Sequence, residues 1–167
     1  MLFLKEMNIE DAKKEYIAMT SIPEDENGFM NKFYNISFEE FVNEVIPTCE
    51  KQSKGIDLKP NRVPQNYYFL WDNDEIVGLF KVRKKLNDSL RDGAGHIGYG
   101  IIKKYRNKGY ATRGLKLVIE LIKDEIEEDE IYMSVNKDNP YSLKTQLNFG
   151  AYIFSENEEQ YFTRIKI

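Results

Sequence analysis

The chain has 167 residues, the length of one domain, and its 41% apolar and 13% aromatic content is enough for a single sizeable core. Charged residues make up 31% and the net charge is −4, which argues against general nucleic-acid binding because such proteins show a basic domain or stripe. No membrane-length apolar run, no secretory signal pattern and no partner for the single Cys49 are found, so we expect a soluble, cytoplasmic domain without disulfides.

The first third of the chain predicts one strand, two helices and two irregular segments. A capping box marks one helix start, because Ser37 is followed three residues later by Glu40. Pro23, Gly28 and several acidic residues make the segment between the two helices a predicted loop. In chain order the elements are a strand over residues 1–7, a helix over 9–19 that Asn8 can cap, the loop over 21–35, a helix beginning after Ser37 and a connector over 53–65.

The middle of the chain is rich in β-branched and aromatic residues and predicts strands. Residues 67–71 and 76–82 are two such runs, separated by a turn-forming tetrapeptide over 72–75, which is the pattern of a β-hairpin. A polar loop over 86–95 and a strand over 96–102 follow.

The last third predicts two helices set between strands. Apolar residues recur at helical spacing at Ala111, Leu115, Val118 and Ile122, so residues 110–125 predict an amphipathic helix. The remaining elements are a strand over 131–135, a helix beginning at Pro140 and ending before Gly150, and strands over 151–154 and 161–167. Strands and helices mixed in this order predict one α/β or α+β domain in layers around one sheet.

The segment from Arg106 to Ala111 has the features of an anion site, because it lies between a predicted strand and the start of the amphipathic helix. The first turn of a helix has unpaired N–H groups and a partial positive charge, and both attract phosphate. Gly109 allows a tight turn and a close approach of the backbone to a ligand. The same residues would also suit a plain polar turn into a helix.

The pattern Arg-x-x-Gly-x-Ala before this helix resembles the pyrophosphate-binding signature of the GNAT superfamily of N-acetyltransferases. The resemblance extends in order and spacing over about residues 74–154, half of the chain. The segments that carry it are Gly98–Ile102, Lys108–Thr112, Val135 to Ser142 with Asn136 and Asn139, and Phe149–Ala151.

The resemblance implies a single GNAT-like domain with a mixed, mostly antiparallel sheet of about six to seven strands and about four flanking helices. It implies an acyltransferase that moves an acetyl group from acetyl-CoA directly to a primary amine of a small molecule or peptide. Residues 1–65 would form the acceptor side and residues 66–167 the acetyl-CoA-binding core. No metal is implied, and the oligomeric state stays open, a homodimer included.

The resemblance also assigns the acetyl-CoA site residue by residue. The strand would bond the pantetheine arm through backbone groups, amides from Arg106 through Thr112 would hold the pyrophosphate, and Asn139 would contact the arm from the other side. A plain helix cap is the alternative role for Asn139. The full set is Ile101, Ile102, Lys103, Arg106, Asn107, Lys108, Gly109, Tyr110, Ala111, Thr112, Asn139 and Ser142.

His96 is the candidate general base. It is the only histidine, and its ordinary pKa suits proton transfer at neutral pH. Regular alternation along the strand would place it on the face of Gly98 and Gly100, with open space beyond. A structural or surface histidine is the alternative. The acid for the leaving thiolate is unassigned, because Gln146 stands where many relatives have a tyrosine, and Cys49 has no identifiable base beside it.

The acceptor amine is predicted to meet the loop between the first two helices, where acidic and aromatic residues could hold a cation. The candidates are Glu24, Phe29, Phe33 and Tyr34. A solvated acidic loop is the alternative.

Two other functions are weighed. A catalytically inactive acyl-CoA-binding module is suggested by Gln146. A nucleic-acid-binding domain would have to use the basic clusters at 81–85 and 103–108, against the acidic net charge. The G-x-G-x-x-G match at 93–98 has a polar loop before it and a strand after it, so it is not a dinucleotide fingerprint.

Overall fold

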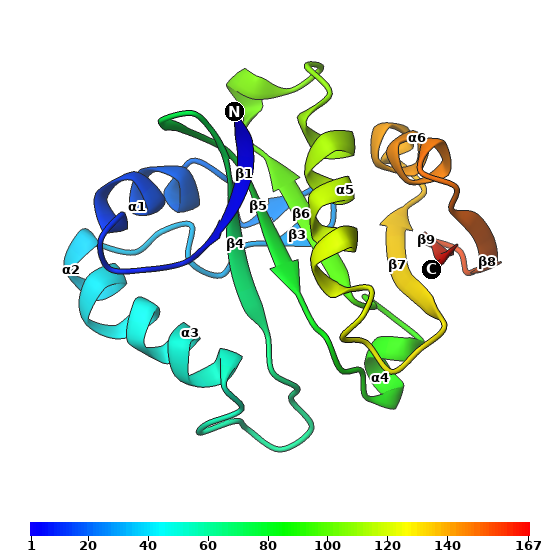
Figure 1. Ribbon diagram of the computed structural model, residues 1–167, viewed down its shortest axis with the longest axis horizontal. Helices are drawn as coiled ribbons and strands as arrows, with labels where there is room; N and C mark the ends of the chain where they lie inside the picture. Colours follow the sequence, from blue (N-terminus) through cyan, green and yellow to red (C-terminus); the bar gives the residue numbers. More distant parts are fainter.

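The computed structural model describes residues 1–167 as antiparallel sheets flanked by helices (Figure 1). The strands are β1 Leu2–Glu6, β2 Asp25–Glu26, β3 Phe29–Met30, β4 Asn66–Asp72, β5 Glu75–Val82, β6 Ile97–Ile101, β7 Glu130–Asn136, β8 Tyr152–Glu156 and β9 Gln160–Lys166. The helices are α1 Ala12–Thr20, α2 Phe38–Glu40, α3 Ile46–Ser53, α4 Asp88–Arg91, α5 Tyr110–Ile122 and α6 Pro140–Asn148. A π turn, η1 Phe41–Val45, joins α2 to α3, and a 3-10 turn, η2 Lys103–Tyr105, precedes α5.

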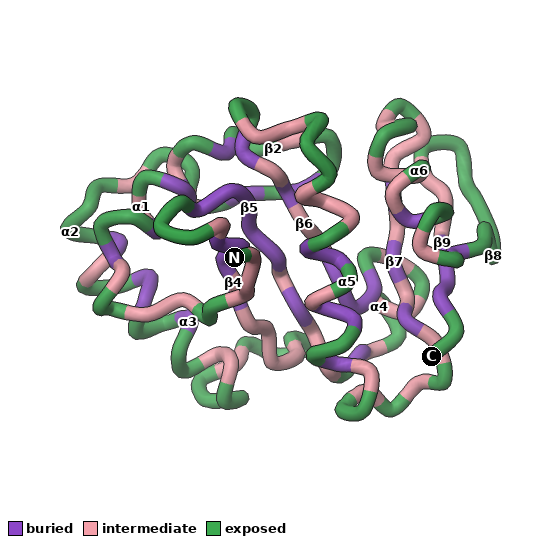
Figure 2. Tube along the Cα trace, turned by 45° about the horizontal axis from the view of Figure 1, so that its top comes forward, coloured by how far each residue is buried: buried purple, intermediate pink, exposed green.

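The larger sheet has the strand order β1-β4-β5-β6 and separates two apolar clusters. On one face the residues of α1, η1 and α3 pack around Phe69 and Leu79. On the other face α5 packs against Leu70 and Phe80. Buried backbone follows β4 and β5 through the middle of the molecule, whereas β8 is exposed along its length (Figure 2). The two faces of the larger sheet are therefore covered by different helices.

The second sheet, β7-β9-β8, is joined to the first by backbone pairing at only one point. There Gly95 and Met133 form an isolated antiparallel bridge, and the His96 N–H donates to the Tyr132 carbonyl at 2.7 Å. Beyond this point β6 and β7 are not paired. The single sheet of about six to seven strands expected from the sequence is therefore divided in two, although the antiparallel α+β domain is confirmed.

Most elements expected from the sequence are present, and three differ. Residues 21–35 are not all loop, because β2 and β3 form a hairpin inside them. The polar loop over 86–95 contains α4, whose first turn is capped by Asn87. The first helix begins at Ala12 instead of residue 9, because the Asn8 side chain accepts the Asp11 N–H in a turn that precedes the helix. The Ser37 capping box forms as predicted.

The two parts divided at residue 65 share one sheet, because β1 pairs with β4 along its full length. The N-terminal helices are thereby fixed to the strands that carry the candidate site. None of the helices is both long enough and apolar enough to span a bilayer.

Candidate functional site

The loop before α5 presents a row of unused backbone donors. No backbone N–H from Asn107 to Thr112 donates a hydrogen bond within the protein, and the helical ladder starts with the Arg113 N–H donating to the Gly109 carbonyl at 3.1 Å. Asn107 and Gly109 are in the left-handed region, with φ of 61° and 73°. Successive N–H groups in such a turn, at a helix N-terminus, form a concave site for phosphate oxygens.

The position of this loop is fixed by side chains on each side of it. The Arg106 Nε donates to the Ile101 carbonyl at 3.1 Å, and its guanidinium pairs with Glu26 at 2.6 Å. The Tyr110 hydroxyl donates to Asp72 at 2.7 Å. A Cβ at Gly109 would meet nothing within 4 Å, so the glycine is required for its backbone angle and not for lack of room.

A cleft of about 840 Å³ opens between the two sheets at the point where β6 and β7 part. The loop before α5, the start of α6, and the β2–β3 hairpin line it. A volume of this size falls in the range of small-molecule and cofactor sites.

The cleft has two arms, one ending in β6 and the other in β7. The β2–β3 hairpin covers the cleft on one side and contacts both arms. Its turn, Asn27-Gly28, has φ of 52° and 90°, the conformation of a tight type I′ turn. Phe29 packs over Gly100 of β6, where an added Cβ would meet its ring at 3.3 Å. A Cβ at Gly28 would come within 2.6 Å of the Asn136 side chain of β7, so the hairpin tip rests on the opposite arm.

The two faces of β6 offer two approaches to the cleft. On the face of α5, the free amides of residues 107–112 lie at the helix start, and Tyr99 reaches toward α6. On the opposite face, Phe29 of the hairpin packs near Gly98 and Gly100. A donor held by α5 and an acceptor entering under the hairpin would therefore meet from opposite sides.

The structure brings most of the predicted acetyl-CoA residues to this cleft. Three do not line it: Ile102 donates its N–H to Val77 at 3.0 Å and is buried in the core, and Lys103 and Lys108 are exposed outside it. The Arg106 amide is also used, donating to the Lys103 carbonyl in η2. Those that line the cleft are Ile101, Arg106, Asn107, Gly109, Tyr110, Ala111, Thr112, Asn139 and Ser142.

Asn139 forms the helix cap that was the alternative to a ligand contact. Its Oδ1 accepts the Ser142 N–H at 3.1 Å, and Pro140 begins α6 directly after it. The cap side chain still lines the cleft, so the geometry leaves room for both roles.

Backbone groups alternate between the two sides of an antiparallel strand. Since the Ile102 N–H points to β5, that of Ile101 points toward the β6–β7 gap.

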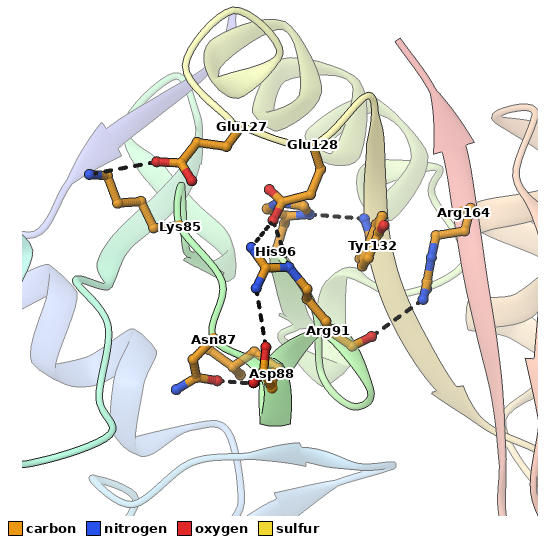
Figure 3. Close-up of polar contacts among 10 residues, drawn as sticks. Lys85, Asn87, Asp88, Arg91, His96, Glu127, Glu128, Tyr132 and Arg164 are labelled. Carbon is orange, nitrogen blue, oxygen red and sulfur yellow. Dashed lines mark hydrogen bonds and ion pairs between the residues drawn. The ribbon is translucent and has the colours of Figure 1, made fainter.

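His96 does not lie in the cleft, so the expected open space beside it is wrong. The ring is fully buried, its Nδ1 accepts the Tyr132 N–H at 2.9 Å, and its Nε2 lies 3.0 Å from Glu128 (Figure 3). With Nδ1 as an acceptor, Nε2 carries the proton and donates to the carboxylate. Burial lowers the pKa of His96, against the opposite influence of Glu128. Both nitrogens are therefore occupied, one by the backbone of β7 and the other by the segment before it.

Glu128 extends this junction to the neighbouring elements. Its other oxygen pairs with Arg91 of α4 at 2.9 Å, and the Arg91 carbonyl accepts from Arg164 of β9 at 3.3 Å (Figure 3). The histidine therefore belongs to a polar network that connects α4, β7 and β9 outside the cleft. Its tautomer and partners assign it a structural position, the alternative that its sequence context left open.

Of the four predicted acceptor-side residues, only Phe29 lines the cleft. Glu24 is exposed outside it, Phe33 packs on Tyr67 with ring centroids 6.0 Å apart, and Tyr34 is exposed. Glu26 is the loop carboxylate that reaches the cleft, and it is paired with Arg106. Three of the four predicted residues therefore lie outside the cleft.

Gln146, at the position where many relatives have a tyrosine, is buried and accepts the Thr163 hydroxyl at 2.6 Å. A different tyrosine reaches α6 from the strand side. Tyr99 of β6 lines the cleft, and its hydroxyl lies 2.7 Å from the Ser142 Oγ. Burial raises the pKa of Tyr99, so the phenol keeps its proton at neutral pH.

The cleft residues that were not predicted as site residues include Tyr99, Lys81 and Arg83. The signal for the two cations was a basic cluster after a strand, which local sequence does not place on either face. No group of three or more His, Cys, Asp or Glu side chains lies close enough to hold a metal ion.

Comparison with known proteins gives a family and a fold. A family model described as an acetyltransferase (GNAT) domain matches residues 2–151. No curated protein matches the chain by sequence.

Several solved structures share the fold along nearly the whole chain. A GNAT-family acetyltransferase from Streptococcus pneumoniae is 17% identical with a TM-score of 0.68, covering 100% of this chain and 99% of its own. A microcin C7 self-immunity acetyltransferase, in complex with acetyl-CoA and AMP, is 16% identical with a TM-score of 0.71, covering 99% and 92%. A spermidine N-acetyltransferase from Vibrio cholerae, in complex with CoA and spermine, is 15% identical with a TM-score of 0.64, covering 99% and 95%.

Proposed function

Because the chain belongs to the acetyltransferase (GNAT) domain family, we propose that it is an acetyl-CoA-dependent N-acetyltransferase acting on a primary amine. The observation that carries the proposal is the row of free amides from Asn107 to Thr112 at the start of α5. These donors, at the positive end of a helix, suit the diphosphate of coenzyme A. The cleft beside them is large enough for the rest of the donor to reach the gap between β6 and β7.

In the proposed reaction a neutral amine enters under the hairpin and its nitrogen attacks the thioester carbonyl carbon. The Ile101 N–H, directed into the gap, is the donor for the developing oxyanion. The C–S bond then breaks, the amine loses a proton to water in the cleft, and the thiolate leaves with a hydrogen bond from the Tyr99 hydroxyl. His96 takes no part in these steps, because both of its nitrogens are occupied away from the cleft.

The test is release of free thiol from acetyl-CoA with a panel of primary amines. We expect turnover with at least one amine and none without an acceptor, because the cleft has an approach from each face. Binding of acetyl-CoA by calorimetry without turnover on a broad panel would favour the inactive module that Gln146 suggests. Failure to bind acetyl-CoA would contradict the proposal at its first step.

Tyr99→Phe is expected to lower kcat by about ten- to a hundredfold, because a hydrogen bond to a charged group contributes roughly 1.5–3 kcal/mol. The Kd for acetyl-CoA should change little, since the bond to the sulfur forms only as the thiolate departs. Tyr152→Phe, which removes a hydroxyl bonded to Glu130 outside the cleft, is the control and should leave kcat unchanged. Equal rates in the Tyr99 variant and the parent would remove this hydroxyl from the mechanism.

A further inference from the structure

Two cations line the hairpin side of the cleft without an acidic partner. Lys81 and Arg83 of the β5 region are both half-buried, and no carboxylate lies within ion-pair distance of either. The Lys81 ammonium donates to the Met30 carbonyl and lies 4.4 Å from the centre of the Phe29 ring. The Arg83 guanidinium donates to the Gly95 carbonyl at 3.2 Å.

The strand register places these cations on the acceptor approach. Lys81 pairs with Gly98 of β6, and both lie on the face that Phe29 covers. The Arg83 backbone N–H donates to the His96 carbonyl at 2.8 Å, which places Arg83 next to the junction of β6 and β7. The diphosphate loop and α5 pack on the opposite face of the sheet. The two cations are therefore separate from the proposed acetyl-CoA site.

Holding these charges without a counter-ion costs free energy. Burial, reinforced by Arg83 and Lys32, lowers the pKa of Lys81 to about 8. Burial also lowers the pKa of Arg83. The carboxylate from the hairpin that reaches the cleft, Glu26, is already paired with Arg106 at 2.6 Å. An uncompensated pair of cations in a cleft is a fixed charge that an anionic ligand would neutralise.

We infer that the acceptor is a small primary amine that also carries an anionic group, a carboxylate or a phosphate, held by Lys81 and Arg83. This inference rests on the proposed acetyltransferase function and adds the substrate class. Arg forms paired hydrogen bonds with carboxylate and phosphate oxygens, and Lys adds a point charge beside them. A polyamine would bring like charge against the same two residues, so it is a poor acceptor.

The experiment compares amines matched except for the anion. The pairs are alanine with alaninamide and phosphoethanolamine with ethanolamine, and spermidine is the cationic arm. We expect kcat/KM for one anionic member to exceed that of its neutral partner by about tenfold or more. The pair that shows the preference distinguishes carboxylate from phosphate. In Lys81→Gln and Arg83→Gln the ratio should fall toward one. Lys85→Gln removes the same charge from an exposed position outside the cleft and should keep the ratio.

Two results would overturn the inference: equal or better use of the neutral and cationic amines, or a ratio unaffected by both substitutions. Acetyl-CoA affinity, measured for every variant, shows that the fold and the donor site remain. If acetyl-CoA binds but no amine is acetylated, the catalytic proposal fails by itself. The substrate class is then tested by titrating N-acetylalanine and inorganic phosphate into the CoA complex. Binding that Lys81→Gln weakens supports the anion site, and no binding overturns it.

Discussion

Replacing Thr112 by glutamate is expected to weaken acetyl-CoA binding by about a hundredfold or more, while leaving the protein at least as stable as before. Thr112 lies in the first turn of α5 and lines the cleft. A carboxylate there stands against the diphosphate, and two charges about 4 Å apart repel by about 4 kcal/mol near a protein surface. The same carboxylate favours the helix, because negative charge near a helix N-terminus stabilises it by about 0.3–1 kcal/mol.

The substitution is expected to weaken acetyl-CoA binding but not to lower the stability of the protein, so a loss of folding cannot explain the weaker binding. Calorimetry gives the Kd for acetyl-CoA, and urea denaturation gives the free energy of unfolding. Lys116→Gln changes the net charge by the same amount on an exposed part of α5 outside the cleft, so it should leave the Kd within about threefold, as expected for a screened surface charge. An unchanged Kd in Thr112→Glu would show that the diphosphate does not occupy this helix start.

Gly95→Ala is expected to reduce the free energy of unfolding by about 3 kcal/mol or more, among the largest effects of a single methyl group. Gly95 has φ of 65° and bridges to Met133, where β6 and β7 join. An alanine Cβ would lie 2.1 Å from the Tyr132 carbonyl oxygen, which already accepts the His96 N–H. Since the obstacle is backbone, the junction itself must move.

Gly150→Ala separates the two causes of this loss. Gly150 has φ of 89° but meets nothing within 4 Å, so its substitution carries the backbone cost alone, about 1–2 kcal/mol. Urea denaturation of the parent protein and the two variants under one condition gives the change in the free energy of unfolding for each substitution. A loss in Gly95→Ala no greater than that in Gly150→Ala would mean that the junction accommodates the methyl group without strain.

Sequence patterns predicted the elements well where residues close in sequence determine the structure. The amphipathic spacing from Ala111 to Ile122 gave α5, and the Ser37 hydroxyl with Glu40 gave the start of α2. The β2–β3 hairpin was missed although Asn27-Gly28 is a strong turn signal, because acidic residues precede it in place of an alternating apolar strand. The hairpin is held instead by contacts with β6 and β7, which are distant in sequence.

The residues of the candidate site also separate into those that local sequence predicts and those that contacts distant in sequence position. The free amides before α5 follow from a local turn, so sequence sufficed to find them. His96 was misplaced because Tyr132 and Glu128, which occupy its nitrogens, come from a strand and loop more than 30 residues later. Lys81 and Arg83 were overlooked because their importance lies in the carboxylates that are missing around them, a property of packing and not of spacing.

The division of the sheet has a mechanical consequence. Each arm of the cleft is a separate antiparallel sheet, with four strands on one side and three on the other. The backbone pairing at Gly95 and His96 is the one point at which the two sheets join. The arms share no other strand pairing, but away from the cleft they share one apolar core, in which Ile131 and Met133 of β7 pack with Phe80 of β5. At the open end the contacts between the arms are made by side chains: the Tyr99 hydroxyl of β6 lies against Ser142 of α6, and Gly28 of the hairpin rests on Asn136 of β7. We therefore expect ligand entry to disturb only the side chains at the open end, while the shared core keeps the two ladders aligned.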